Sequence, residues 1–129
     1  MTLGELISKV EMLNPSEYDK DELTQWVNEV EFMAVDQVFS KALGVGVDFK
    51  PYKYELDSEK ELLIPDQFNG VYTTYISTKI DFNYKEIDRY NMDSIQFDAE
   101  WQAFASWYRR THKPRRMRDE IPHNKYSPI

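Results

Sequence analysis

The sequence predicts a mainly α-helical domain of about four helices, with one β-hairpin between the second and third helices and an extended C-terminal arm. Apolar residues recur at intervals of three and four along most of the chain, and an alternating pattern is confined to residues 52–64. Residues 112–129 hold three prolines and few aliphatic side chains. We therefore expect a helical domain over residues 1–111 and a flexible basic arm over residues 112–129.

The first helix is expected to begin after Thr2 and to end at Leu13. Thr2 and Glu5 have the Thr-x-x-Glu spacing of a capping box, in which each side chain bonds the backbone N–H of the other residue. The apolar residues that recur at helical intervals are Leu3, Leu6, Ile7, Val10 and Leu13. Asn14-Pro15 ends the helix, because a residue before proline is disfavoured in the α conformation.

A second helix is expected from Asp19 to Ser40. Asp19 precedes Glu22 by three residues, the spacing at which an N-cap carboxylate accepts a backbone N–H. The apolar face of this segment carries Leu23, Trp26, Val27, Val30, Met33, Ala34 and Val38. Because Trp26 belongs to that face, we expect it in the core. Gly44-Val45-Gly46 marks the break that follows.

Residues 52–64 are the strand-like part of the sequence. Tyr52–Leu56 alternates, "DSEK" can form a turn, and "ELLIP" is apolar up to Pro65. We expect a β-hairpin here that packs on helices or pairs with another copy, because an isolated hairpin is marginally stable. Tyr52 and Tyr54 would share one face of the hairpin, either against the helices or at a subunit interface, and the sequence does not choose between these positions.

Two further helices are expected, over 66–83 and 86–110, with a short turn around Tyr84 and Lys85. The first carries Phe68, Val71, Tyr72, Tyr75, Ile76 and Ile80. The second carries Ile87, Ile95, Ala99, Phe104 and Tyr108. The turn is expected because an unbroken helix over 66–110 would be far longer than average.

Trp101 and Trp107 lie six residues apart in the last predicted helix. At about 100° per residue they are separated by about 240°, so they do not share a face. One of them should therefore lie off the core stripe, where an exposed tryptophan can anchor another protein. We take Trp101, with Tyr52 and Tyr54, as the candidate subunit-interface residues.

The charge is divided unevenly along the chain. The formal net charge is −7, yet residues 109–129 hold seven Lys or Arg against two Asp or Glu, which leaves −12 for the rest. A body this acidic repels phosphate backbones, so any nucleic-acid contact would have to lie in the arm. Arg109 and Arg110 complement the negative end of a helix. The basic residues beyond the helix would bind phosphate or an acidic protein surface, or would only aid solubility; they are Lys113, Arg115, Arg116 and Arg118.

No catalytic, cofactor or metal site is predicted. The sequence has no cysteine, no Gly-rich phosphate loop and no His-Glu-x-x-His motif, and its two histidines, His112 and His123, lie in the arm. The carboxylates near 19–22 and 57–61 lack the spacing of a calcium-binding loop. The N-terminus is too polar for a signal peptide and no apolar run is long enough to span a membrane. We therefore expect a protein that is not an enzyme and is not exported.

The order of several motifs resembles the head-tail connector, or adaptor, proteins of tailed bacteriophages and prophages. The motifs are "LLIP" leading into a tyrosine-rich helix, "EIDRYN" opening the next helix and "WYRRTHKP" closing it. The opening "LGELISKVEMLNPSEYDKDELTQWVNEVE" is also similar. The resemblance covers residues 1–114, and the region 44–54 and the last 15 residues match less clearly.

The resemblance implies a structural virion protein that passes from the host cytoplasm into a ring, commonly of twelve copies, beneath the portal protein. Such a ring extends the DNA channel and presents a surface to a downstream connector or tail protein. In that family the C-terminal segment reaches the portal, which here corresponds to Trp107, Tyr108, Arg109, Arg110 and the basic residues of the arm. The alternative that we keep is a nucleic-acid-binding phage accessory protein that uses the basic arm. A small enzyme or regulator with a carboxylate-rich surface is a weaker third possibility.

Overall fold

The computed structural model describes residues 1–42 and 47–112. Within these residues the named secondary-structure elements are all helices, and there is no β-sheet. The α-helices are α1 (Leu3–Leu13), α2 (Lys20–Gln37), α3 (Tyr54–Asp57), α4 (Gly70–Asn83) and α5 (Ile87–Thr111). Two short 3-10 helices, η1 (Phe39–Lys41) and η2 (Asp66–Phe68), follow α2 and precede α4. The mainly α-helical class that the sequence predicts is thus confirmed.

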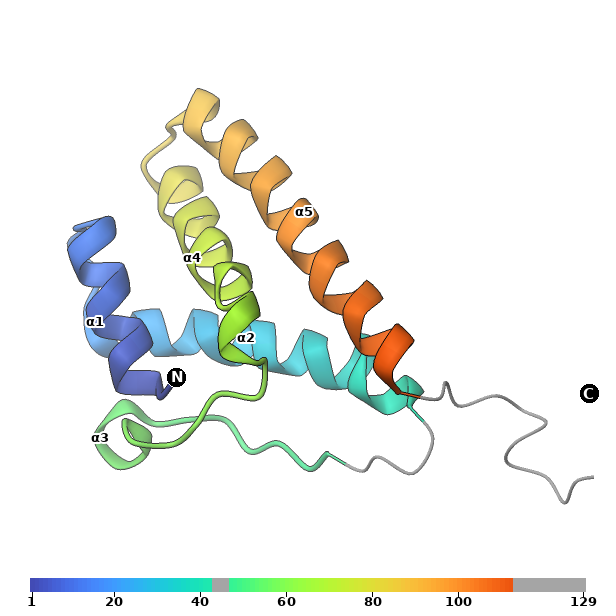
Figure 1. The fold of residues 1–129 in the computed structure, drawn as a ribbon. Helices are drawn as coiled ribbons and strands as arrows, with labels where there is room; N and C mark the ends of the chain where they lie inside the picture. The colour runs from blue at the N-terminus through green and yellow to red at the C-terminus, as the bar shows by residue number, and fades with distance from the viewer. Residues whose placement is uncertain (43–46, 113–129) are drawn as a thin grey trace, which may run out of the picture.

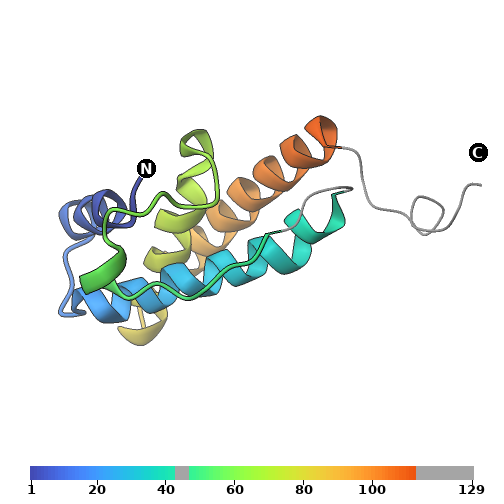
Figure 2. The ribbon, with the colours of Figure 1, turned by 90° about the horizontal axis from the view of Figure 1, so that it is seen from below.

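Helices α4 and α5 form an antiparallel pair that is joined by a tight turn (Figure 1). Lys85 in this turn has a φ of 59°, the left-handed conformation that reverses the chain in the fewest residues. Helix α1 lies on the opposite side of α4 from α5, and α2 crosses behind α1 and the lower part of α4 (Figures 1 and 2). The turn predicted at Tyr84 and Lys85 is therefore present.

The predicted starts of the first two helices are confirmed in atomic detail, whereas the helix predicted from residue 66 begins at Gly70, after η2. The Thr2 hydroxyl accepts from the Glu5 N–H at 3.2 Å, and the Glu5 carboxylate accepts from the Thr2 N–H at 3.0 Å. The Asp19 carboxylate accepts from the Glu22 N–H at 2.9 Å. These bonds satisfy backbone donors that the first turn of each helix leaves free.

The core lies where α2 crosses α1 and α4, and it extends along the inner face of α5. Its fully buried side chains include Leu6, Ile7, Val27, Val30, Tyr72, Ile76 and Phe104. These residues recur at helical spacing, so each helix contributes one apolar stripe. Trp26, which was expected in the core, is half-buried and packs edge-on against Tyr18 with ring centroids 5.0 Å apart.

The predicted β-hairpin near 52–64 is wrong. Residues 54–57 form one turn of helix, α3, and the rest contains turns and bends, with a single antiparallel bridge between Glu61 and Thr2 in place of a second strand. The backbone of Tyr52 bonds to a side chain instead, because the Asn28 amide accepts from its N–H at 2.8 Å and donates to its C=O at 3.1 Å. Asp57 then accepts from the Lys53 N–H at 2.8 Å, which favours a helical turn over an extended strand.

The second half of that segment pairs with the N-terminus. Backbone N–H groups of Leu3 and Gly4 donate to the carbonyls of Lys60 and Ser58 at 3.0 and 2.7 Å, and Leu62 N–H donates to the Met1 carbonyl at 3.0 Å. The backbone groups that a hairpin would have paired locally are thus satisfied across about 60 residues of chain. In Figure 2 the chain before α3 runs alongside α2, and the chain after α3 returns past α1. The predicted Gly44–Gly46 break and the arm beyond His112 lie outside the described residues.

Candidate functional site

The C-terminal end of α5 is an aromatic cluster. Tyr108 is buried, its ring lies 4.9 Å from that of Phe39, and it stacks on the His112 imidazole at 3.8 Å. Trp107 is half-buried and packs against Phe68 with ring centroids 5.3 Å apart. Burying Tyr108 inside its own subunit leaves Trp107 and His112 as the members of the cluster that a partner can reach.

The basic residues that flank this cluster are the predicted portal contacts. Arg109 and Arg110 are exposed, and Arg109 makes a weak 3.4 Å hydrogen bond to the Ser106 hydroxyl. The other predicted portal contacts fall outside the described residues; they are Lys113, Arg115, Arg116 and Arg118. Contact with a portal stays a prediction for all of these residues.

The three predicted subunit-interface residues lie apart from one another. Tyr52 is buried and bonds Asn28 and Glu31 of α2. Tyr54 is half-buried beneath the Lys20 ammonium group, which lies 5.4 Å from its ring centroid, and Trp101 packs between the rings of Phe97 and Phe104. Tyr52 therefore packs on the helices of its own subunit. A contact with a neighbouring copy stays a prediction for the partly exposed Tyr54 and Trp101.

Glu31 of α2 is fully buried at the centre of the molecule. Its carboxylate accepts from the Tyr52 hydroxyl at 2.8 Å, from the Leu63 N–H at 2.9 Å and from the Tyr72 hydroxyl. The Tyr72 hydroxyl in turn accepts from the Ile64 N–H at 3.0 Å. The network connects α2, the segment before η2, and α4, and it fixes the path of the segment that was expected to be a hairpin.

Burial raises the pKa of Glu31, and the three hydrogen bonds to its carboxylate oppose that rise. Burial and the nearby Glu31 carboxylate raise the pKa of the Tyr52 and Tyr72 phenols. Both tyrosines are therefore protonated donors at neutral pH. Since every hydrogen bond of this network stays inside the fold, we interpret it as structural.

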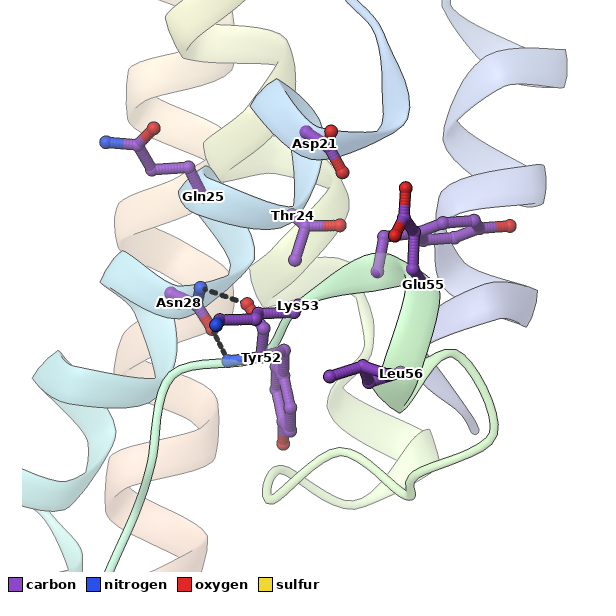
Figure 3. A pocket seen from close by; sticks show the side chains of 9 residues that line it. Asp21, Thr24, Gln25, Asn28, Tyr52, Lys53, Glu55 and Leu56 are labelled. Carbon is purple, nitrogen blue, oxygen red and sulfur yellow. Dashed lines mark hydrogen bonds between the residues drawn. The ribbon is translucent and has the colours of Figure 1, made fainter.

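An open pocket of about 600 Å³ lies between α2 and α3 (Figure 3). Its polar side chains are Asp21, Thr24, Gln25, Asn28, Lys53 and Glu55. Asn28 uses both amide groups on the Tyr52 backbone, as the dashed lines in Figure 3 show. Asp21, Gln25 and Glu55 are exposed, so no sheltered pair of titratable groups is available here for acid-base chemistry.

A second groove, of about 430 Å³, lies between the end of α1, α4 and the start of α5. It is lined by Val10, Leu13, Asn14, Thr73, Thr74, Ser77, Asp81, Arg89 and Asp93. Asp81 of α4 is only 3% exposed, and one of its carboxylate oxygens has no hydrogen-bond partner. Burial and the adjacent Asp93 carboxyl raise the pKa of Asp81 to about 7, while Arg89 opposes the rise.

The turn between α4 and α5 carries an apolar surface. Phe82, Ile87 and Tyr90 line a depression of about 670 Å³ whose surface is almost wholly apolar. Met92 and Ile95 continue along α5 and are each 71% exposed. We refer to these five side chains as the α4–α5 tip. Such a concentration of large exposed apolar side chains is typical of an interaction site.

Sequence reasoning missed Glu31 and Asp81. Glu31 is four residues after Val27 on the apolar face of α2, and a charged residue at such a position is the signal that could have found it. Asp81 is four residues after Ser77, next to the apolar stripe of α4. Its partner Asp93 lies on another helix, so their proximity is not visible in the sequence.

Comparison of the chain with known protein families, with curated proteins and with solved structures finds no match. Within the described residues, no three His, Cys, Asp or Glu side chains are grouped to hold a metal ion. None of the helices there is both long and apolar enough to cross a membrane. The function is therefore argued from the surfaces described above.

Proposed function

We propose that the chain is a structural, non-catalytic protein of the head-tail interface of a tailed bacteriophage. It assembles from the host cytoplasm into the virion as a ring beneath the portal protein, extends the DNA channel and links the head to a downstream connector or tail protein. The order of the motifs "LLIP", "EIDRYN" and "WYRRTHKP" supports this family, and twelve copies are the number that the resemblance implies.

The observation that carries the proposal is the α4–α5 tip. Ile87, Met92 and Ile95 are each 71% exposed, and Phe82 is 66% exposed. Burying a large apolar side chain stabilises an assembly by about 1.5–3 kcal/mol, so the tip provides the driving force for contact with another protein surface. A ring of identical subunits uses this kind of contact between unlike faces.

The charge of the molecule supports a channel for DNA. Residues 1–112 hold 11 Lys or Arg against 21 Asp or Glu, a net charge of −10. Because affinity for a duplex comes from neutralising its phosphates, a ring lined by carboxylates lets DNA pass without binding it. The exposed Arg109 and Arg110, together with the arm, are then available for the portal.

Electron microscopy of the full chain mixed with its portal tests the proposal. We expect closed rings on the portal, and we expect Ile87→Asp/Ile95→Asp to abolish them. Leu56→Asp is the matched control, because Leu56 is 78% exposed on α3, away from the tip. The proposal is wrong if the wild-type chain neither forms rings nor binds the portal while it binds duplex DNA tightly at physiological salt.

A second candidate function is that of a nucleic-acid-binding accessory protein, favoured by the five Lys or Arg against two Asp or Glu in residues 113–129. This function predicts duplex affinity that falls steeply with salt, because each phosphate contact releases counterions. It also predicts that removing residues 112–129 abolishes binding to DNA. The connector function predicts that the same truncation abolishes binding to the portal.

A further inference from the structure

The groove between α1, α4 and α5 contains a carboxyl pair that makes no salt bridge with any residue that the structure describes. Asp81 and Asp93 face each other across it, and no salt bridge to either carboxylate is present among residues 1–42 and 47–112. The charged groups that act on Asp81 are Asp93, Arg89 and Glu86, so its surroundings carry one positive charge against two negative ones. The unpartnered oxygen of Asp81 is buried, and Asp81 is one of the residues that line the groove.

We propose that this groove binds the side chain of Arg115 or Arg116 from the basic arm of a second copy of the chain. A guanidinium group presents several N–H donors in one plane and can bond two carboxylates at once. The Thr73 and Ser77 hydroxyls in the groove lining offer further acceptors, and the Val10 and Leu13 side chains offer apolar contact for the arginine stem. The inference rests on the ring assembly of the proposed function and identifies one of its contacts.

Chain geometry excludes Arg115 and Arg116 of the same copy. Asp93 and His112 are separated by about 28 Å of α5, at 1.5 Å per residue. Arg116 is four residues beyond His112, so the extended backbone reaches about 14 Å from the end of the helix. The Arg116 side chain adds only about 7 Å, which leaves it, and likewise Arg115, short of its own groove.

The charges of the two parts are complementary. Residues 113–129 have a net charge of +3, and residues 1–112 have a net charge of −10. An acidic groove at one end of α5 and a basic segment at its other end join copies head to tail. Repeated around an axis, this heterologous contact closes a ring. The Arg109 and Arg110 side chains on α5 remain available for the portal.

A peptide-binding measurement tests the groove directly. The probe is a fluorescent peptide of residues 111–121, and the receptor is the full-length Arg115→Gln/Arg116→Gln chain, whose own arm cannot compete. We expect saturable binding that weakens at least tenfold in a receptor that also carries Asp81→Asn/Asp93→Asn. Asp98→Asn is the matched control: it removes an exposed carboxylate of α5 and should change Kd less than twofold. Equal binding to the Asp81→Asn/Asp93→Asn receptor, or stabilisation of the chain by Mg²⁺ or Ca²⁺ without peptide binding, overturns the proposal.

Cross-linking distinguishes a second copy from the same copy. The natural chain has no cysteine, so Ser77→Cys in the groove and Met117→Cys in the arm are the only thiols of the double variant, and each single variant measures the disulfides that form between like cysteines. Oxidising the full-length double variant should give dimers and higher multimers. The control is the Ser8→Cys/Met117→Cys variant, in which the new cysteine is exposed on α1 outside the groove, and it should give few cross-linked multimers. A cross-linked monomer as the sole product would overturn the assignment to a second copy.

Ring assembly separates this inference from the proposed function. If Asp81→Asn/Asp93→Asn forms rings on the portal as the wild type does, the groove contact is wrong and the connector function stands. If the wild-type chain forms no rings while the peptide binds the groove as expected, the connector function fails and the groove contact stands. Circular dichroism of each variant establishes that it is folded.

Discussion

Replacing Asp81 by asparagine should make the isolated protein more stable above neutral pH. Burial and the adjacent Asp93 raise the pKa of Asp81 from 3.8 to about 7, so the folded protein binds this proton more tightly than the unfolded chain does. The stability that comes from the protonated carboxyl is therefore complete below pH 3.8 and is lost as the pH rises towards 7. Asparagine is neutral at every pH, and it avoids this loss.

The size of the effect follows from the same pKa values. Each tenfold change in proton affinity is worth about 1.4 kcal/mol, so a change from 3.8 to about 7 corresponds to a ceiling of about 4 kcal/mol. The groove is open to water on one side, and water screens the charge. We expect about half of the ceiling, roughly 2 kcal/mol, as the gain in the free energy of unfolding of Asp81→Asn at pH 8.

Urea unfolding at pH 5, 6, 7 and 8 measures this gain. The difference between Asp81→Asn and the wild type should widen by about 1–2 kcal/mol from pH 5 to pH 8, most of it below pH 7. Asp98→Asn serves as the control, because Asp98 is exposed on the same helix and its replacement should give a difference that does not change with pH. A constant difference for Asp81→Asn, or one that narrows as the pH rises, would refute the reasoning.

Three further substitutions test the fold in the same urea assay. Glu31→Ala leaves three donors without an acceptor and should cost roughly 3 kcal/mol, so a cost below 1 kcal/mol would contradict the network described here. Phe104→Ala removes a fully buried ring and should cost about 4 kcal/mol, against less than about 0.5 kcal/mol for the exposed Met92→Ala. Lys85→Gly should raise the free energy of unfolding by about 0.5 kcal/mol, because glycine adopts the φ of 59° at this position without strain. Lys79→Gly, within α4, should lower the free energy of unfolding by about 1 kcal/mol. A change of the same sign in both variants would show that the turn is not strained.

The helix boundaries could be predicted because their signals are local. The Thr2–Glu5 box and the Asp19 cap are each contained within four residues, and the observed bonds are those that the spacing implies. The turn at Lys85 followed from helix length alone. Where side chains within a few residues bond the free backbone N–H groups of a segment, its conformation can be predicted from the sequence.

The hairpin could not be rejected from the sequence, because its competitors are distant. Alternation at Tyr52 and Tyr54 is compatible with a strand. Besides the local bond between Lys53 and Asp57, the Asn28 amide on α2 and the carbonyl and N–H groups of residues 1–4 redirect the backbone. The same applies to Tyr52 itself, whose hydroxyl is held by Glu31 across 21 residues of chain. Long-range acceptors decide the conformation here, and local pattern does not record them.

Some of the interaction surfaces can also be recognised from the sequence, whereas others depend on contacts between distant residues. Charge asymmetry is a property of composition, so the basic end at Arg109 and Arg110 could be recognised at once. The α4–α5 tip required the turn to bring Phe82 and Ile87 together, and the carboxyl pair required α4 and α5 to be antiparallel. Both the tip and the carboxyl pair depend on how α4 and α5 pack against each other, and the sequence alone does not show this arrangement.

Asp81 is the residue whose position the isolated subunit explains least. Helix polarity accounts for Asp88 at the start of α5 and for Arg109 and Arg110 at its end. Asp81 instead lies in the last turn of α4, where the helix dipole disfavours a negative charge, and it is buried beside a second carboxyl. The helix dipole, the burial and the neighbouring carboxyl all disfavour a charged Asp81. A cation supplied by another copy would offset all three. Asp81→Asn would then raise the stability of the monomer and weaken ring assembly, and this opposite response would separate an assembly contact from a poorly placed charge.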